Sequence, residues 1–236
     1  MSDWKPKRFW KNATVVAVDG GHTVHLDGRP VKTPSKAGLI VPTAAMAAAM
    51  AAEWDAQVEL VDPRTMPVTR CANSAIDKVR VQHADVAAML AEYGDSDLLC
   101  YRAADPEGLV RRQAEGWDPV LEWAEKELGV RLRVAQGVMH VKQDPVALKR
   151  LREELDAFDE FALTAVHDLI SLSGSLVLAL AVTRNALLPE DAWTLSRIDE
   201  HWQIEQWGAD EDANADEMIK RAAFLDALRF YQLSLP

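Results

Sequence analysis

Residues 39–57 read LIVPTAAMAAAMAAEWDAQ, and the periodicity of the chain changes within this stretch. Before Pro42 the apolar residues come in short runs separated by turn residues, which is typical of strands. Thr43 suits the N-cap of a helix, and the alanines that follow it have strong helix propensity. The chain is therefore predicted to be α+β, with a small antiparallel β domain over residues 1–42 and a larger α-helical domain over residues 43–236.

The β domain is predicted from turn signals that separate strand-like runs. Asp19-Gly20-Gly21 and Asp27-Gly28 are hairpin signals, so the runs on either side of each are expected to pair antiparallel. The expected strands are Thr14–Val18, Thr23–Leu26, Pro30–Thr33 and Leu39–Val41. Strands this short and closely spaced predict a small sheet.

Helical periodicity dominates the rest of the chain. Met46, Met50 and Trp54 follow one another at i, i+4 and i+8, so they lie on one face of the Ala-rich helix. Core packing is the preferred interpretation of this stripe over a ligand site, with Trp54 largely buried against the helical domain. Further helices are predicted over Val68–Ala91, Glu107–Leu128, Pro145–Asp156, Phe158–Ser173, Ser175–Asn185, Pro189–Gly208 and Asp212–Leu233.

Composition argues against several classes of function. The formal net charge of −11 disfavours binding to nucleic acid or anionic lipid, because both depend on Lys and Arg. The most apolar run, residues 176–182, is far shorter than the roughly 20 residues that span a bilayer, so no membrane insertion is expected. Cys71 and Cys100 lack metal or redox spacing and indicate buried thiols in a reducing compartment. The N-terminus shows no leader segment, which predicts a cytoplasmic protein; the oligomeric state is open, with a monomer favoured.

One helix face stands out in the C-terminal third. Five of its residues stand at i, i+4, i+7, i+11 and i+14, so on a helix they form one narrow strip. This mainly apolar strip has a Trp at each end and a carboxylate midway along it. A buried Glu is costly unless it is paired, so Glu200 is either held by Arg197 or presented to a partner. The opposite face, with Leu195, Ile198 and Trp202, is also apolar. The strip consists of Trp193, Arg197, Glu200, Ile204 and Trp207, and the acidic residues Asp210, Glu211 and Asp212 follow it.

Signatures of catalysis and of cofactor binding are missing from the sequence. There is no G-x-G-x-x-G, no phosphate-binding P-loop and no H-E-x-x-H. His201 and Glu205 stand at i and i+4, a spacing that a metal could use, but a solvated surface pair is preferred. Residues 171–175 (SLSGS) are interpreted as a helix break with Ser capping the next helix, rather than as a nucleophile elbow. No catalytic residue, metal or cofactor is therefore predicted.

Residues 93–102 (YGDSDLLCYR) are dense in polar side chains for a joint between helices. Asp95 or Asp97 can cap the next element, and Arg102 can pair with one of them. A hydrogen-bonded structural corner is preferred here over a catalytic site.

A series of short motifs runs in order along nearly the whole chain. They are residues 8–11 (RFWK), 26–29 (LDGR), 32–34 (KTP), 53–57 (EWDAQ), 66–69 (MPVT), 95–102 (DSDLLCYR), 172–176 (LSGSL) and 195–208 (LSRIDEHWQIEQWG). Each motif alone is weak, but their order is specific. Together they resemble the family of ATP-synthase assembly chaperones that act on the α subunit of the catalytic head (the Atp-twelve family).

The resemblance implies a non-enzymatic chaperone with the α subunit of F-type ATP synthase as its partner. Such proteins bind the free α subunit, shield the surface that will contact the β subunit, and leave as the α/β ring forms. Without an import presequence, the chain looks like a bacterial, cytoplasmic member. The Glu of the family's L-D-E motif, regarded as functionally important, maps to Glu200. The Trp of its E-W-D-x-Q motif, regarded as structurally sensitive, maps to Trp54.

Two other classes of function stay open on the residues alone. One is an enzyme that uses Glu200 as general base, with His201, Glu205 or Asp199 nearby. The other is a module that binds a small ligand in a Trp-lined pocket. The form of the Trp193–Trp207 face, whether closed cavity, open groove or buried core, discriminates among the three.

Overall fold

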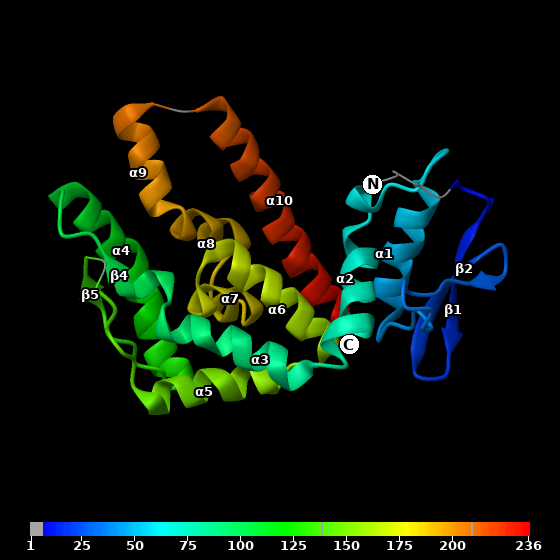
Figure 1. Ribbon diagram of the computed structural model, residues 1–236, viewed down its shortest axis with the longest axis horizontal. Coiled ribbons are helices and arrows are strands. Elements are labelled where there is room, and N and C mark those ends of the chain that lie inside the picture. The colour runs from blue at the N-terminus through cyan, green and yellow to red at the C-terminus, as the bar shows by residue number, and fades with distance from the viewer. Residues whose placement is uncertain (1–6, 138, 209) are drawn as a thin grey trace. The chain divides into compact units, whose positions relative to one another are not determined.

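The computed structural model describes residues 7–137, 139–208 and 210–236 and divides them into two compact units (Figure 1). The first contains the described residues up to His83 together with 159–165 and 229–236, and the second contains 84–158 and 166–228. A small sheet precedes a series of helices, which confirms the predicted α+β class. The predicted boundary at residue 42 stays a prediction about independent folding; the first compact unit continues past it. The N-terminal residues 1–6, on which the expectation of no leader rests, lie outside the described residues.

The sheet of the first unit is built from β1 (Ala13–Val18), β2 (Gly21–Leu26) and β3 (Arg29–Pro30), paired antiparallel in that order. Val18 lies opposite Gly21, so the β1–β2 turn has two residues, and Gly20 takes a positive φ of 81° in it. The predicted strands Thr14–Val18 and Thr23–Leu26 are confirmed. The segment Leu39–Val41 is not a full strand: Val41 forms an isolated bridge with His22, and the Leu39 carbonyl accepts a hydrogen bond from the Thr23 hydroxyl at 2.7 Å.

The Ala-rich segment forms α1 (Ala44–Asp55), which packs on β1 and β2. The Thr43 side chain accepts a hydrogen bond from Met46 N at 3.0 Å, which confirms the predicted N-cap. Met46 and Met50 are fully buried. The expectation that Trp54 is largely buried against the helical domain is wrong, because Trp54 is only half-buried. Its ring meets that of Trp10, which precedes β1, edge-on at 5.2 Å between centroids.

The remaining helices of the first unit follow a Pro-punctuated link. The carboxylate of Glu53 accepts hydrogen bonds from Val68 N and Thr69 N, at 2.7 and 2.8 Å, and so caps the first turn of α2. The helix predicted over 68–91 is divided, because the chain leaves helical geometry at residues 80–82. The elements are η1 (Pro63–Thr65), α2 (Pro67–Ser74) and the π-helical turn η2 (Ala75–Val79); α3 (His83–Ala91) follows and belongs, except for His83, to the second unit.

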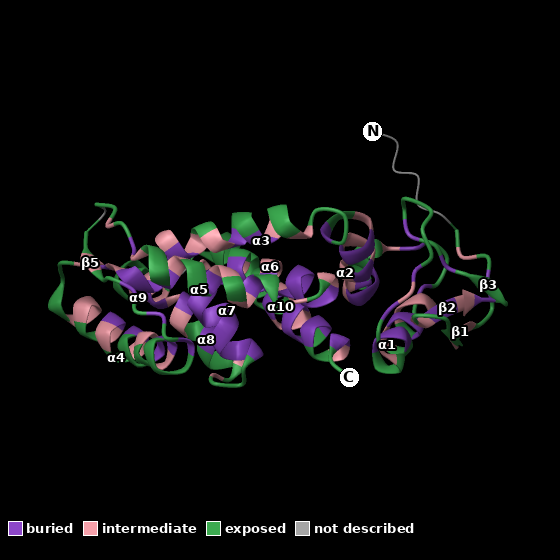
Figure 2. Ribbon diagram, turned by 90° about the horizontal axis from the view of Figure 1, so that it is seen from below, coloured by how far each residue is buried: buried purple, intermediate pink, exposed green. Residues whose placement is uncertain are grey.

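The second unit has α7 (Leu176–Thr183) as its most buried helix, with all eight residues buried (Figure 2). Ser175 caps it by accepting a hydrogen bond from Leu178 N at 3.0 Å, which confirms the interpretation of residues 171–175. No helix in the described part of the chain is long and apolar enough to span a membrane. The other elements are η3 (Glu92–Asp95), η4 (Leu98–Cys100), β4 (Tyr101–Arg102), α4 (Glu107–Trp123), η5 (Ala124–Leu128), β5 (Ala135–Gln136), α5 (Pro145–Asp156), α6 (Glu160–Ser173), α8 (Pro189–Ser196), α9 (Ile198–Trp207) and α10 (Glu211–Ser234). The first turns of α6, up to residue 165, and the end of α10, from residue 229, belong to the first unit.

The prediction of a single helix over Pro189–Gly208 is wrong in one respect, because the helix is interrupted at Arg197 and forms α8 and α9. Arg197 has φ −115° and ψ 16°, outside α-helical geometry. The Leu195 carbonyl, a helix acceptor, instead accepts a hydrogen bond from the indole Nε1 of Trp117 at 2.8 Å. The break therefore comes from a contact with α4, which local periodicity could not reveal.

Candidate partner-binding groove

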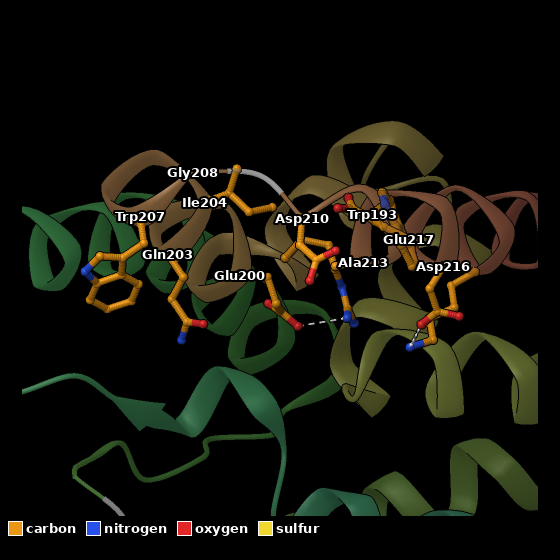
Figure 3. Close-up of a pocket in the computed structure, with 12 residues that line it drawn as sticks. Trp193, Glu200, Gln203, Ile204, Trp207, Gly208, Asp210, Ala213, Asp216 and Glu217 are labelled. Atoms are coloured by element: carbon orange, nitrogen blue, oxygen red, sulfur yellow. Dashed lines mark hydrogen bonds and ion pairs between the residues drawn. The ribbon is translucent and has the colours of Figure 1, made fainter.

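An open groove of about 380 Å³ lies between α9 and α10, with the end of α8 at its base (Figure 3). All five members of the predicted strip line it, although the strip now runs over two helices. Carboxylates and a single Lys come from the α10 side. The lining residues are Trp193, Arg197, Glu200, Gln203, Ile204, Trp207, Gly208, Asp210, Ala213, Asp216, Glu217 and Lys220.

Arg197 is held in place from several sides. Its guanidinium lies over the ring of Trp193, 4.8 Å from the centroid. Nη2 donates to the Leu172 carbonyl at 2.8 Å, and Nε donates to the Ser196 hydroxyl at 3.2 Å. The side chain is only 16% exposed. Arg197 is thus a positioned cation in the wall of the groove, because cation–π contact and three hydrogen-bonding partners restrict it.

Glu200 presents its carboxylate to the groove. Oε1 accepts from Arg197 Nη1 at 2.9 Å, the i,i+3 pair drawn as a dashed line in Figure 3. The Glu200 side chain is nonetheless 51% exposed. Arg197 therefore holds the carboxylate, as the first alternative expected, and half of the Glu200 side chain is accessible from solvent; its presentation to a partner stays a prediction. Trp207, at the far end of the strip, is 80% exposed.

The opposite face of α9 is packed against α4, as its apolar residues predicted. A Cβ on Gly116 would lie 2.9 Å from Ile198 Cδ1, and one on Gly108 would lie 2.6 Å from the Trp202 ring, so glycine permits the close approach. Arg112 of α4 forms a two-pronged ion pair with Glu205 at 2.7 and 2.8 Å. This pairing lowers the pKa of the Glu205 carboxyl and raises that of Arg112. Sequence reasoning missed the role of α4, for which two glycines eight residues apart in one helix were the available signal.

Comparisons with known proteins agree with this architecture. The model of the ATP12 chaperone protein family matches residues 7–125. The crystal structure of Atp12 from Paracoccus denitrificans is 52% identical and has a TM-score of 0.95, with 99% of this chain and 100% of that chain covered.

This chain belongs to the ATP12 chaperone family.

Two further relatives extend the likeness. Mitochondrial protein atp12 from Schizosaccharomyces pombe is 28% identical over 220 residues, 88% of this chain and 76% of the relative. The Atu1473 protein from Agrobacterium tumefaciens, described as a candidate chaperone, is 44% identical with a TM-score of 0.92, covering 96% of this chain and 85% of its own. As the resemblance implied, ATP12 proteins are ATP-synthase assembly chaperones and not enzymes. The groove lies beyond the residues that the family model matches, within the part shared with the Paracoccus structure.

The candidate metal ligands and bases near Glu200 do not point toward a common site in this ATP12 protein. They are His201, Glu205 and Asp199. His201 Nε2 lies 2.9 Å from Glu217 Oε1 and links α9 to α10, whereas Glu205 binds Arg112 on the other side of α9. Asp199 accepts from Gln113 Nε2 at 2.6 Å. Within the described ranges no cluster of three or more His, Cys, Asp or Glu residues could hold a metal ion.

The acidic residues after the strip differ in position. Asp210 lines the groove, and its Oδ1 accepts from Asp212 N at 2.9 Å. Glu211 begins α10 and is exposed, but it is not among the lining residues. Five of the six predicted partner-binding residues therefore share one groove.

The polar corner at residues 95–102 is hydrogen-bonded as expected, with one correction to its pairing. Asp97 is fully buried; Oδ1 accepts from Leu99 N at 3.0 Å and Oδ2 from Val177 N at 3.1 Å, which ties η4 to the start of α7. Burial raises the pKa of Asp97 to about 6, against the opposing effect of these hydrogen bonds. Arg102 pairs with Asp118 at 2.8 Å rather than with Asp95 or Asp97, because its side chain extends over the Trp117 ring of α4.

Proposed function

We propose that this ATP12-family chaperone binds the free α subunit of F-type ATP synthase in the groove between α9 and α10. In this proposal it shields the surface of α that contacts the β subunit, and the β subunit displaces it as the catalytic head forms. The observation that carries the proposal is a half-exposed carboxylate, Glu200, held in an open groove by a fixed cation.

The physical problem of an unassembled subunit suits such a surface. A subunit awaiting its neighbours exposes apolar surface and unpaired strand edges, which promote aggregation. The sequence has no phosphate-binding motif, so release by nucleotide hydrolysis has no support. Release by competition requires moderate affinity, built from a few desolvated contacts and matched charge.

The groove offers contacts of this kind. The carboxylate of Glu200 can accept a forked pair of hydrogen bonds from an Arg of the client, the strongest geometry for this pairing. Trp207 is 80% exposed and can bury its indole against the client as an apolar anchor. Trp193, which is 2% exposed, forms the floor and keeps Arg197 and hence Glu200 in position.

The small-ligand alternative is less well supported by this geometry. Ligand sites typically enclose most of the ligand in apolar lining. Here the rim is open, the exposed Trp207 stands at its edge, and four carboxylates contribute to the lining: Glu200, Asp210, Asp216 and Glu217.

We infer that the chaperone acts in the cytoplasm as a monomer. Cys100 is buried, but Cys71 is only half-buried; the two form no disulfide with each other, as expected of a reducing compartment. The net charge of −11 opposes self-association.

The test compares binding to isolated α subunit with binding to assembled catalytic head. We expect a one-to-one complex with isolated α, formed without nucleotide hydrolysis, and little binding to the head. Glu200→Lys should weaken binding at least about thirtyfold, because it replaces attraction by repulsion. Its melting temperature should change little, since the Glu200 side chain is half exposed and Arg197 keeps its hydrogen bonds to Leu172 and Ser196.

A matched control is Glu122→Lys, which makes the same charge change at an exposed position of α4 away from the groove. It should leave α binding within about twofold of wild type. Equal binding to free α and to intact head would contradict the competition mechanism. A well-folded Glu200→Lys protein that binds α as tightly as wild type would contradict the role of the groove.

A further inference from the structure

A second surface of interest lies on the first three turns of α10, on the side opposite the groove. Ala215, Met218, Ile219 and Ala222 are all exposed, and we call them the outer strip. They stand at i, i+3, i+4 and i+7, so they share one face of the helix. Met218 is 73% exposed and Ile219 is 68% exposed. The groove face of the same turns carries Ala213, Asp216, Glu217 and Lys220.

The outer strip reverses the usual pattern of a surface helix. Amphipathic helices bury their apolar face and expose charge. Here residues 211–222, except the half-buried Glu217, are all exposed, and the apolar residues face solvent. Two large apolar side chains in contact with water on one helix face are typical of an interaction surface. The two alanines beside them allow another helix or a groove wall to approach closely.

The acidic residues at the start of α10 do not account for this strip. Carboxylates in the first turn stabilise a helix through its macrodipole, which is a sufficient reason for Glu211 and Asp212. No such effect applies to Met218 or Ile219, which gain nothing from exposure. Their position indicates that another molecule covers them.

Charge discriminates between the possible occupants. Glu211 and Asp212 lie in the turn before the outer strip and do not line the groove, whereas Asp210, Asp216 and Glu217 do. Two copies of the chain, each with a net charge of −11, would repel one another at a shared interface. A partner with basic residues around an apolar groove complements the segment instead.

We infer that the first three turns of α10 insert into an apolar groove with a basic rim on the client subunit, as an amphipathic helix does in helix-in-groove recognition. The client is the one bound by the α9–α10 groove, so this inference rests on the proposed function. The client then contacts both faces of α10: charged groups meet Glu200 on one side, and apolar groups cover Met218 and Ile219 on the other.

The test is the double variant Met218→Ser/Ile219→Ser, assayed for binding to isolated α subunit beside wild type and Glu200→Lys. We expect the dissociation constant to rise about tenfold or more, because two apolar contacts are lost at an interface. The control is Val81→Ser/Val146→Ser, which removes two apolar side chains that are 73% and 61% exposed elsewhere. It should bind like wild type. Hydrogen exchange should also show protection of residues 211–222 when α is added.

The outcomes separate this inference from the proposed function. If Glu200→Lys weakens binding to α but the double serine variant binds like wild type, the outer strip has no role in binding. The proposed role of the groove is then unaffected. Failure of wild type to bind α would overturn both. Light scattering should show a monomer at high concentration; a dimer that the double serine variant abolishes would identify a second copy as the occupant and overturn the inference.

Discussion

Helix α7 and the first three turns of α10 are both helical, but their surroundings are opposite. Every residue of α7, LVLALAVT, is buried. Residues 211–222 of α10 are exposed with one half-buried exception. A helix that is apolar all round belongs in a core, where packing stabilises it. A helix exposed on nearly all sides adds little to the core, so its side chains are available for recognition. The comparison separates the part of the second unit that maintains the fold from the part that we propose contacts a partner.

The two helices also differ in how they begin. The N-terminus of α7 is satisfied by buried groups, with the Ser175 hydroxyl accepting from Leu178 N and the Asp97 carboxylate accepting from Val177 N. At the start of α10 the Asp210 carboxylate accepts from Asp212 N in an exposed setting. Capping by a buried carboxylate makes the stability of α7 depend on pH, whereas an exposed cap is replaceable by water.

Truncation of a core residue in α7 should have the largest effect. Leu178→Ala removes a fully buried side chain and leaves a cavity, which should lower the free energy of unfolding by about 3–5 kcal/mol. Urea denaturation followed by far-UV circular dichroism measures it. A loss below about 1 kcal/mol would mean that α7 is not the rigid centre of this unit.

The titration of Asp97 tests whether the buried cap of α7 makes stability depend on pH, unlike the exposed cap of α10. Burial raises the pKa of Asp97 to about 6 in the folded chain, above its ordinary value, so between roughly pH 4 and 6 the folded state binds more protons than the unfolded state. The contribution of this group to stability is therefore present below its unfolded pKa and is lost as the pH rises through about 6. Relative to Asp97→Asn, wild type should gain on the order of 2 kcal/mol from pH 7 to pH 4. Denaturation of both proteins at several pH values measures this difference, and a relative loss on acidification would contradict the assignment.

The smallest effect is expected on the outer strip of α10. Met218→Ala should change the free energy of unfolding by less than about 0.5 kcal/mol, because the side chain is 73% exposed. Native-state hydrogen exchange should be much faster for amides of residues 211–222 than for those of α7, since few buried contacts oppose local opening. Equal protection in the two helices would show that the first turns of α10 belong to the stable core.

Local signals in the sequence were sufficient for much of the fold. The change of period at Thr43, the hairpin glycines and the Ser caps act within four residues, and the structure shows the elements that they predict. The five-residue strip from Trp193 to Trp207 also lines one groove, because the helical period places its members on one side even across a single broken residue. The ordered motifs indicated the family, which the comparisons show.

Contacts between distant segments decided the rest. The break at Arg197 depends on Trp117, which lies some 80 residues earlier and donates a hydrogen bond to the Leu195 carbonyl. The partner of Arg102 is Asp118 of α4, and the neighbour of Trp54 is Trp10. The exposure of Glu200, Met218 and Ile219 likewise follows from which faces the other helices cover. A sequence specifies which side chains share a helix face through its period, but burial and pairing are set by neighbours that only the folded chain brings together.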